Sequence, residues 1–124
     1  MSIHKSGEDY LETILLLTNK SPFVRSIDIA NELGFTKPSV SRAVGILKAD
    51  GFITVGNDGQ ILLTESGKKR ANEVYAKHSV LKKFLEEIIG VDKEVAEEDA
   101  CKIEHVISEE SYSKLRKFIE EYQS

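Results

Sequence analysis

Two short helical patterns joined by a turn of three or four residues constrain the fold more than any other feature of the sequence. Ser26 is a good N-cap for the first pattern. Its buried face has apolar residues at helical spacing: Ile29, Ala30 and Leu33. Gly34 ends the pattern at a position that tolerates positive φ. Thr36 then caps the next helix, with Pro38 in the first turn, where a missing amide hydrogen costs little.

The elements around these two helices complete a recognisable order. The second helix has an apolar back at positions i, i+3, i+4 and i+7: Val40, Ala43, Val44 and Leu47. Two β-rich runs, residues 52–55 and 60–63, flank the turn residues 56–59 and predict a hairpin. Residues 3–20 predict a preceding helix with a broad apolar face. Helix, short helix, turn, helix and hairpin is the order of a winged helix-turn-helix.

Charge is unevenly distributed along the chain. The formal net charge is −4, which taken alone disfavours nucleic acid as a partner. Residues 1–72 nevertheless carry nine Lys/Arg against eight Asp/Glu, whereas residues 73–124 carry eight against thirteen. Residues 36–49 contain three cations and no acid, and such local patches decide the attraction to phosphate. The acidic second part needs counter-charge, for which divalent cations are one candidate.

The exposed front of the second helix suits contact with DNA, because a helix fits the major groove. Small hydroxyls allow close approach, Lys37 is placed for phosphate, and Arg42 can reach a guanine edge or a phosphate. The candidate DNA-binding residues are Thr36, Lys37, Pro38, Ser39, Ser41, Arg42 and Lys48. A basic solvated face on an unrelated three-helix unit is the alternative. Because the turn, caps and wing all agree, we expect a DNA-binding domain over residues 1–72.

The rest of the chain predicts three helices. Thr64 can cap a long one that reaches about residue 89, Asp92 caps another to about Val106, and Ser108 caps the last. The apolar stripe of the long helix includes Tyr75, and the expected buried stripe of the last helix is Tyr112, Leu115, Ile119 and Tyr122. These stripes exceed what so short a region can bury alone. We therefore expect a mainly α fold in which residues 73–124 form a helical dimerisation and metal-binding domain.

Several side chains have the chemistry of metal ligands. Three of them share one face of a predicted helix at i, i+3 and i+4: Cys101, Glu104 and His105. First-row transition metals accept this mixture of sulfur, oxygen and nitrogen. Asp9 and Glu12 stand at i and i+3 on the first helix, and His78 lies on the apolar stripe of the long helix. Each also has an ordinary interpretation: core cysteine, buried hydrogen-bonded histidine, or acids that complement a helix dipole.

Stretches in both parts of the chain resemble the diphtheria toxin repressor family, which includes iron-dependent repressors and manganese transport regulators. The matching stretches cover residues 8–12, 26–30, 38–41, 62–67, 78–81 and 100–106. They span nearly the whole chain in the family's order. The resemblance implies a metal-dependent transcriptional repressor that binds double-stranded operator DNA as a homodimer and controls metal homeostasis genes. It also implies a short form without the SH3-like domain of longer members.

The resemblance further implies a ligand set and a choice of ions, Mn²⁺ or Fe²⁺, with one or two ions per chain. The first site would use Asp9, Cys101, Glu104 and His105. At position 9 the chain resembles the manganese regulators, which also have an aspartate there. At position 101 it resembles the iron repressors, which have a cysteine. A second ion would bind Glu12 and His78, with Glu104 as a further candidate. Two ligands of the iron repressors' other site fall on Lys82 and Glu97, and a lysine ammonium is no ligand.

Other functions are weighed against this one. A winged-helix regulator could sense oxidation through Cys101 without a metal switch, although carboxylates nearby disfavour the thiolate. An enzyme that uses Cys101 and His105 lacks a phosphate loop or an oxyanion-forming turn, so we expect no catalysis and no small organic ligand. A plain interaction module leaves the basic helix unexplained.

The sequence also indicates where the protein works. No apolar run approaches the ~20 residues of a membrane span, since the longest covers residues 14–17. The N-terminus has no secretory pattern. We therefore expect a cytoplasmic protein with no membrane partner.

Overall fold

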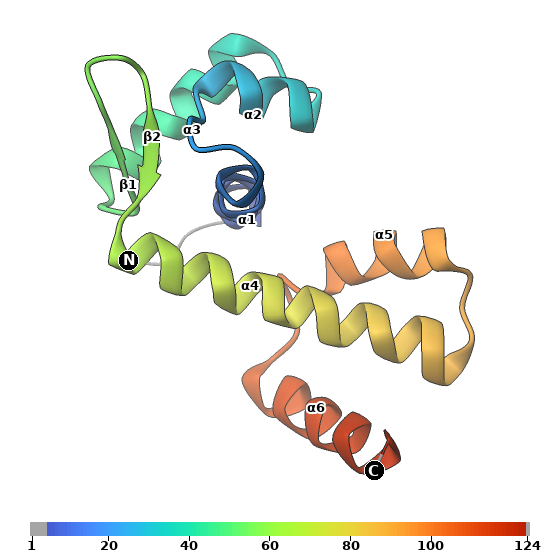
Figure 1. The fold of residues 1–124 in the computed structure, drawn as a ribbon. Coiled ribbons are helices and arrows are strands. Elements are labelled where there is room, and N and C mark those ends of the chain that lie inside the picture. Colours follow the sequence, from blue (N-terminus) through green and yellow to red (C-terminus); the bar gives the residue numbers. More distant parts are fainter. Residues whose placement is uncertain (1–4, 124) are drawn as a thin grey trace. The chain divides into compact units, whose positions relative to one another are not determined.

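The computed structural model of the chain describes residues 5–123. Contacts within the chain divide it between Asn72 and Glu73 into two compact units. In the first unit, three helices lie around a shared core and a hairpin follows them (Figure 1). The second unit consists of helices alone. Among the described residues, no helix is both long and apolar enough to cross a membrane.

The first unit has the predicted order of elements. Its helices and strands are α1 (Lys5–Lys20), α2 (Ser26–Leu33), α3 (Lys37–Ala49), β1 (Ile53–Val55) and β2 (Ile61–Leu63). The strands are antiparallel, with Ile53 opposite Leu63 and Val55 opposite Ile61. Two contacts fix the hairpin to the loop before α2: the Ile61 N–H donates to the Val24 carbonyl at 2.8 Å, and Gln60 Nε2 donates to the Pro22 carbonyl at 3.0 Å. The hairpin is therefore held to this loop beside its turn, where β2 begins.

The turn between α2 and α3 is built as expected. Gly34 adopts φ +70°, and its N–H donates to the Ala30 carbonyl at 2.8 Å. Thr36 Oγ1 accepts from the Ser39 N–H at 3.3 Å, so the predicted cap of α3 is confirmed. The predicted cap at Ser26 is wrong, because Arg25 takes that position. The Asp28 carboxylate accepts from the Arg25 N–H at 2.8 Å, which favours a helix start one residue earlier.

The start of α4 (Glu65–Lys83) is packed closely against the preceding segment. Thr64 Oγ1 donates to the Gly51 carbonyl at 2.7 Å and accepts from the Gly67 N–H at 3.1 Å. Gly67 leaves no room for a side chain, since a Cβ there would lie 2.0 Å from the Phe52 carbonyl oxygen. The absence of a side chain at Gly67 thus allows α4 to approach the end of the helix-turn-helix.

A single apolar core holds the first unit together. The fully buried side chains come from all three helices, the hairpin and the loop before α2: Leu11, Ile14, Val24, Ile29, Val40, Leu47, Ile53 and Ile61. Burying a side chain of this size contributes about 1.5–3 kcal/mol. The shared core fixes α3 by its apolar back, so the opposite side of that helix faces solvent.

The second unit departs from the prediction in two places. The long helix expected to reach residue 89 gives way after Lys83 to a π-helix, η1 (Phe84–Ile89), which ends at Gly90. Helix α5 (Lys93–Ile103) ends three residues before Val106, and α6 (Glu109–Gln123) follows. The wider turn of η1 changes the direction in which side chains leave the helix, which periodicity at 3.6 residues does not anticipate.

Other expectations for the second unit can be compared with burial. The caps at Asp92 and Ser108 are confirmed, since their side chains accept from the N–H groups of Glu94 and Ser111. Apolar residues buried in this unit are Val74, Leu81, Ala96, Ala100, Tyr112 and Ile119. Tyr75 and Tyr122 were expected to be buried but are exposed. A tyrosine at the edge of a stripe can keep its hydroxyl in water, so the apolar stripes are narrower than predicted.

Two glycine-to-alanine substitutions should therefore have opposite effects on stability. Gly67→Ala forces a Cβ into the Phe52 backbone, and we expect it to lower the free energy of unfolding by about 1–3 kcal/mol or more. Gly45→Ala in α3 is the matched control, because a Cβ there meets nothing within 4 Å. Alanine should raise helix stability by about 0.5–1 kcal/mol at this position. Urea denaturation of both variants measures the difference, and equal effects would contradict the close approach at Gly67.

Candidate DNA-binding surface and metal centre

The predicted DNA-contacting residues all lie at or beside the start of α3 or along its solvent side. Each is exposed: Thr36, Lys37, Pro38, Ser39, Ser41, Arg42 and Lys48. The Thr36 hydroxyl donates to Ser39 Oγ at 2.9 Å, which leaves the Ser39 hydroxyl hydrogen available to another acceptor. Because the apolar back of α3 is buried, its cations are presented on the surface of the first unit.

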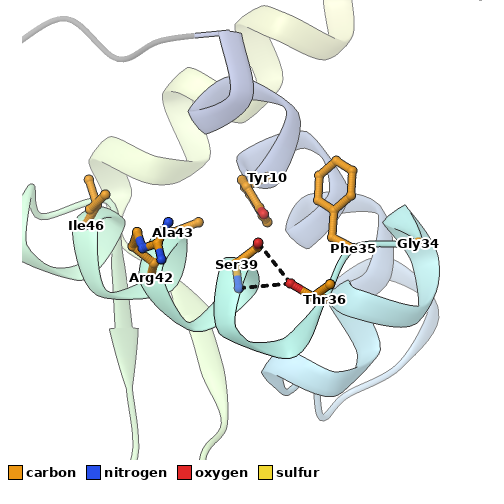
Figure 2. Close-up of a pocket in the computed structure, with 8 residues that line it drawn as sticks. All are labelled: Tyr10, Gly34, Phe35, Thr36, Ser39, Arg42, Ala43 and Ile46. Carbon is orange, nitrogen blue, oxygen red and sulfur yellow. Dashed lines mark hydrogen bonds between the residues drawn. The ribbon is translucent and has the colours of Figure 1, made fainter.

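A shallow depression of about 500 Å³ adjoins this surface. Figure 2 shows that Tyr10 and Phe35 border it on one side, and that Ser39 and Arg42 approach it from α3. The rings of Tyr10 and Phe35 meet edge to face at 6.0 Å. Phe35 and Ile46 are about half exposed, although both side chains are large and apolar. Because both residues line the depression, the surface has an apolar component beside the hydroxyls and cations of α3.

The six predicted metal ligands are distributed over both units. Asp9 and Glu12 lie about one turn apart on α1 in the first unit, and both are half-buried. His78 is on α4, and Cys101 is on α5. Glu104 caps the C-terminus of α5, and His105 lies in the turn after it. The helix therefore does not extend through His105 as predicted.

The predicted cluster in the second unit is nevertheless brought together. The Glu104 N–H still donates to the Ala100 carbonyl at 3.0 Å, so the chain keeps its helical course to that residue. One ligand atom from each of Cys101, Glu104 and His105 lies within 4.8 Å of the other two. His105 Nε2 is 3.3 Å from Glu104 Oε1. Sulfur, carboxylate and imidazole therefore converge at the end of α5.

Glu104 is the most unusual residue of this cluster. Its side chain is fully buried, and His78 Nδ1 lies 2.9 Å from its Oε2. The contact is short but poorly aligned, so His78 Nδ1 and both Glu104 oxygens lack a hydrogen bond within the described part of the chain. We therefore regard it as a contact of charges rather than a hydrogen bond. Buried polar atoms without such partners are rare and suggest that an ion or water satisfies them.

The neighbourhood of Glu104 strongly changes the acidity of His78. The close Glu104 carboxylate is the main cause that raises the pKa of His78 from 6.5 to about 9. Partial burial opposes this shift, and the negative charges of Glu104 and Glu97 add to it. At neutral pH the metal-free protein thus holds a positive imidazolium beside the buried carboxylate.

The second nitrogen of His78 also has an acidic partner. Nε2 lies 3.0 Å from Glu97 Oε1, and Lys82 Nζ lies 3.3 Å from Glu97 Oε2. Partial burial opposes ionisation of Glu97, but the positive charges and hydrogen bonds of His78 and Lys82 outweigh it. They lower the pKa of Glu97 below its usual value. Lys82, whose ammonium cannot bind a metal, thus forms an ion pair with Glu97.

The pairing of Glu97 with His78 was not predicted, although Glu97 was named as the counterpart of a ligand in the iron repressors. Glu97 precedes Cys101 by four residues and Glu104 by seven, which places the three on one face of α5. That spacing could have indicated that Glu97 belongs to the same cluster.

The donors present in the second unit fit a divalent transition-metal ion. Cys101, Glu104 and His105 combine a soft, a hard and an intermediate ligand in one group. His78 lies against the other oxygen of Glu104. The buried Glu104 oxygens and His78 Nδ1, all without aligned hydrogen bonds, are the observation that favours a cation there. The structure thus provides both a helix surface suited to DNA and a donor set suited to a metal.

The raised pKa of His78 predicts how the metal-free protein responds to pH. Because the folded pKa of about 9 exceeds the unfolded value of 6.5, the stabilisation is complete below pH 6.5. It is lost as the pH rises through 9. We expect urea midpoints to fall between pH 6.5 and 9.5, and a proton NMR titration of His78 to give a pKa near 9. Glu104→Gln should move that pKa toward 6.5, whereas an unchanged value would contradict the assigned cause.

Comparison with known proteins places both parts of the chain in one family. Residues 3–60 match the model for the N-terminal DNA-binding domain of iron-dependent repressors. Residues 64–124 match the model for the metal-binding and dimerisation domain of the same proteins. The two matches meet near the start of α4.

Individual relatives agree with the domain matches. An uncharacterised helix-turn-helix transcriptional regulator of Methanocaldococcus jannaschii is 34% identical over 120 residues, which cover 95% of each chain. The diphtheria toxin repressor of Corynebacterium diphtheriae is 32% identical over 114 residues, covering 92% of this chain and 50% of that protein. The structure of the manganese regulator SloR superimposes with a TM-score of 0.83 at 28% identity, covering 97% of this chain and 55% of that one.

The chain thus spans about half the length of the latter two proteins and nearly all of the Methanocaldococcus jannaschii regulator. The two domain matches, the winged helix-turn-helix and the identity to these regulators lead to one conclusion. The chain belongs to the iron-dependent repressor family of metal-dependent transcriptional regulators.

Proposed function

We propose that this protein represses transcription by binding operator DNA as a homodimer when a divalent metal is bound. The observation that carries this proposal is the buried Glu104 carboxylate, which faces His78 without an aligned hydrogen bond. A protein that only bound DNA would not need such a charged cluster in its other unit. The family assignment supplies the connection between the cluster and transcription.

The metal ligands are proposed from chemistry and resemblance together. Cys101, Glu104 and His105 form the first site with Asp9, and Glu12 and His78 hold a second ion together with Glu104. Carboxylates suit Mn²⁺ and Fe²⁺, and the thiol favours Fe²⁺ of the two. We propose that one or two ions of Mn²⁺ or Fe²⁺ bind per chain, which agrees with relatives described as iron-dependent and manganese-regulating proteins.

The regulatory step follows from the positions of the acids in the sequence. Asp9 and Glu12 belong to the DNA-binding part, proposed as residues 1–72, and Glu104 belongs to the dimerisation part, proposed as residues 73–124. Their carboxylates repel one another in the metal-free protein. A bound divalent ion supplies the positive charge that offsets this repulsion. Ligands from both parts then restrict the orientations that the DNA-binding part samples.

The chain's own residues account for DNA binding. Lys37 and Lys48 attract phosphate groups, and Arg42 binds a phosphate or the edge of a guanine. Ser39 donates its hydroxyl hydrogen to a nearby acceptor. In a dimer, two copies of α3 are expected to read half-sites about 34 Å apart, one turn of DNA.

The second unit supplies a surface for the homodimer. Phe118 is half exposed, and its ring contacts Phe84 edge to face at 6.4 Å and stacks on Tyr122 at 6.0 Å. Ile89 is also exposed. A cluster of exposed aromatic rings is typical of protein interfaces, and this unit matches a dimerisation domain. We propose that a second copy of the chain covers it.

Operator binding should depend on the metal. Fluorescence anisotropy of labelled operator DNA should show about 5–150-fold tighter binding with Mn²⁺ or Fe²⁺ than with chelator, the usual range of coupling between two ligands. Glu104→Ala and His105→Ala should remove this difference. Equal affinity in all conditions would exclude the metal switch, and a response to peroxide alone would favour oxidation of Cys101.

A matched pair of variants separates the two functions. Arg42→Ala should weaken DNA binding while the affinity for Mn²⁺ in the absence of DNA stays unchanged, because Arg42 lies on α3. Glu98→Gln is the control for Glu104→Ala, since Glu98 is an exposed acid of the same helix. This control should keep both the affinity for DNA and its response to metal.

The aromatic cluster gives a separate prediction. Phe118→Glu should convert the dimer to a monomer in light scattering, because a carboxylate would be buried in an apolar interface. Lys117→Glu changes the charge of a neighbouring residue outside the aromatic cluster and serves as the control. Operator affinity should fall for the Phe118 variant alone. A dimer that persists in that variant would place the interface elsewhere.

A further inference from the structure

The two ring nitrogens of His78 face different acids. Nδ1 is directed toward the buried Glu104, 2.9 Å away, without an aligned hydrogen bond. Nε2 is hydrogen-bonded to Glu97 at 3.0 Å. The imidazole is therefore held between a buried carboxylate on one side and a half-exposed carboxylate on the other.

This arrangement determines which nitrogen can act as a ligand. A neutral imidazole has one N–H and one lone pair, and the group that accepts from the N–H fixes where the lone pair is. Glu97 accepts from Nε2, so Nδ1 is the nitrogen that offers a lone pair once a cation displaces its proton. In proteins, a carboxylate behind a histidine commonly fixes the ring's orientation and makes it a better metal ligand.

Lys82 explains why Glu97 does not serve as a ligand itself. Lys82 follows His78 by one turn of α4, and its Nζ lies 3.3 Å from Glu97 Oε2. Glu97 thus presents one oxygen to His78 and the other to Lys82. Both oxygens of Glu97 are engaged, and the Lys82 ammonium balances its charge. Glu97 is thus held on the Nε2 side of His78 rather than against a metal ion.

We infer that Glu97, anchored by Lys82, is a positioning residue that directs His78 to bind the metal through Nδ1. This inference rests on the proposed function, because it assigns His78 as a ligand. It adds two residues to the machinery, neither of which touches the ion. Positive and negative side chains then alternate through space, in the order Lys82, Glu97, His78 and Glu104.

The experiment measures coordination directly. Protein labelled with ¹⁵N-histidine is loaded with ¹¹³Cd²⁺, and the nitrogen of His78 that couples to cadmium is identified by NMR. The wild type should show coupling to Nδ1 and a protected proton on Nε2. Affinity for Mn²⁺ is measured on the same proteins by calorimetry, without DNA.

Three variants and a control test the inference. Glu97→Ala should lower Mn²⁺ affinity by about 10–100-fold, the usual effect of removing such a partner, and should abolish the Nε2 protection. Glu97→Gln can still accept from Nε2 and should lie between Ala and wild type. Lys82→Met should weaken binding in the same direction. Glu98→Gln, at a neighbouring exposed position, should behave as wild type. Circular dichroism checks that every variant is folded.

The outcomes separate this inference from the function on which it rests. Coupling of cadmium to Nε2 in the wild type would overturn the inference, because Glu97 would then occupy the wrong side of the ring. Unchanged Mn²⁺ affinity and unchanged Nδ1 coordination in Glu97→Ala would also overturn it, while the metal-dependent repressor would stand. A wild type that binds neither metal would refute the proposed function itself.

Discussion

A carboxylate that is buried beside two imidazoles dominates the chemistry of this protein. Removing an ionised group from water costs several kcal/mol unless it is paired, and Glu104 is fully buried next to His78 and His105. Positive charge must compensate for it, from a protonated His78 or from a metal ion. The Glu104 carboxylate raises the pKa of His78 to about 9, which corresponds to the first of these solutions. The ion pairs that continue to Glu97 and Lys82 stabilise the same arrangement.

The first unit separates stability from recognition in a simple way. The core takes the apolar back of α3, and the close contact at Gly67 fixes the first turn of α4 against the Phe52 backbone. The solvent side of α3 can then vary its hydroxyls and cations without disturbing the core. Phe35 and Ile46 remain exposed beside these polar groups, so the surface combines charge with apolar contact area.

Much of the first unit could be predicted because its signals are local. Gly34, Thr36 and Pro38 each specify a backbone conformation through chemistry that acts within a few residues, and the hairpin follows from two β-rich runs around a turn. The start of α2 was misplaced by one residue for a related reason. Asp28 reaches back to the Arg25 N–H, and this contact competes with the hydroxyl of Ser26, which a propensity scale alone favours.

The candidate metal centre was predicted only in part. The spacing of Cys101, Glu104 and His105 identified the cluster, and its atoms meet although α5 ends at Ile103. The pairing of Glu97 with His78 and Lys82 was missed, because it depends on which face of α5 packs toward α4. The change to a π-helix after Lys83 was also missed, because a pattern at 3.6 residues per turn does not distinguish the two helices. Such tertiary choices leave no periodic signature in the sequence.

The position of Glu104 at the end of α5 has an electrostatic consequence. The carbonyl groups of a helix's last turn are not bonded within the helix, and together they carry about half a negative elementary charge. Glu104 places a full negative charge at the same end, which makes this terminus unusually unfavourable by itself. A divalent ion there would act as a C-cap for α5. Amide hydrogen exchange in the final turn of α5 would then slow when the metal binds, because the ion also stabilises the end of the helix.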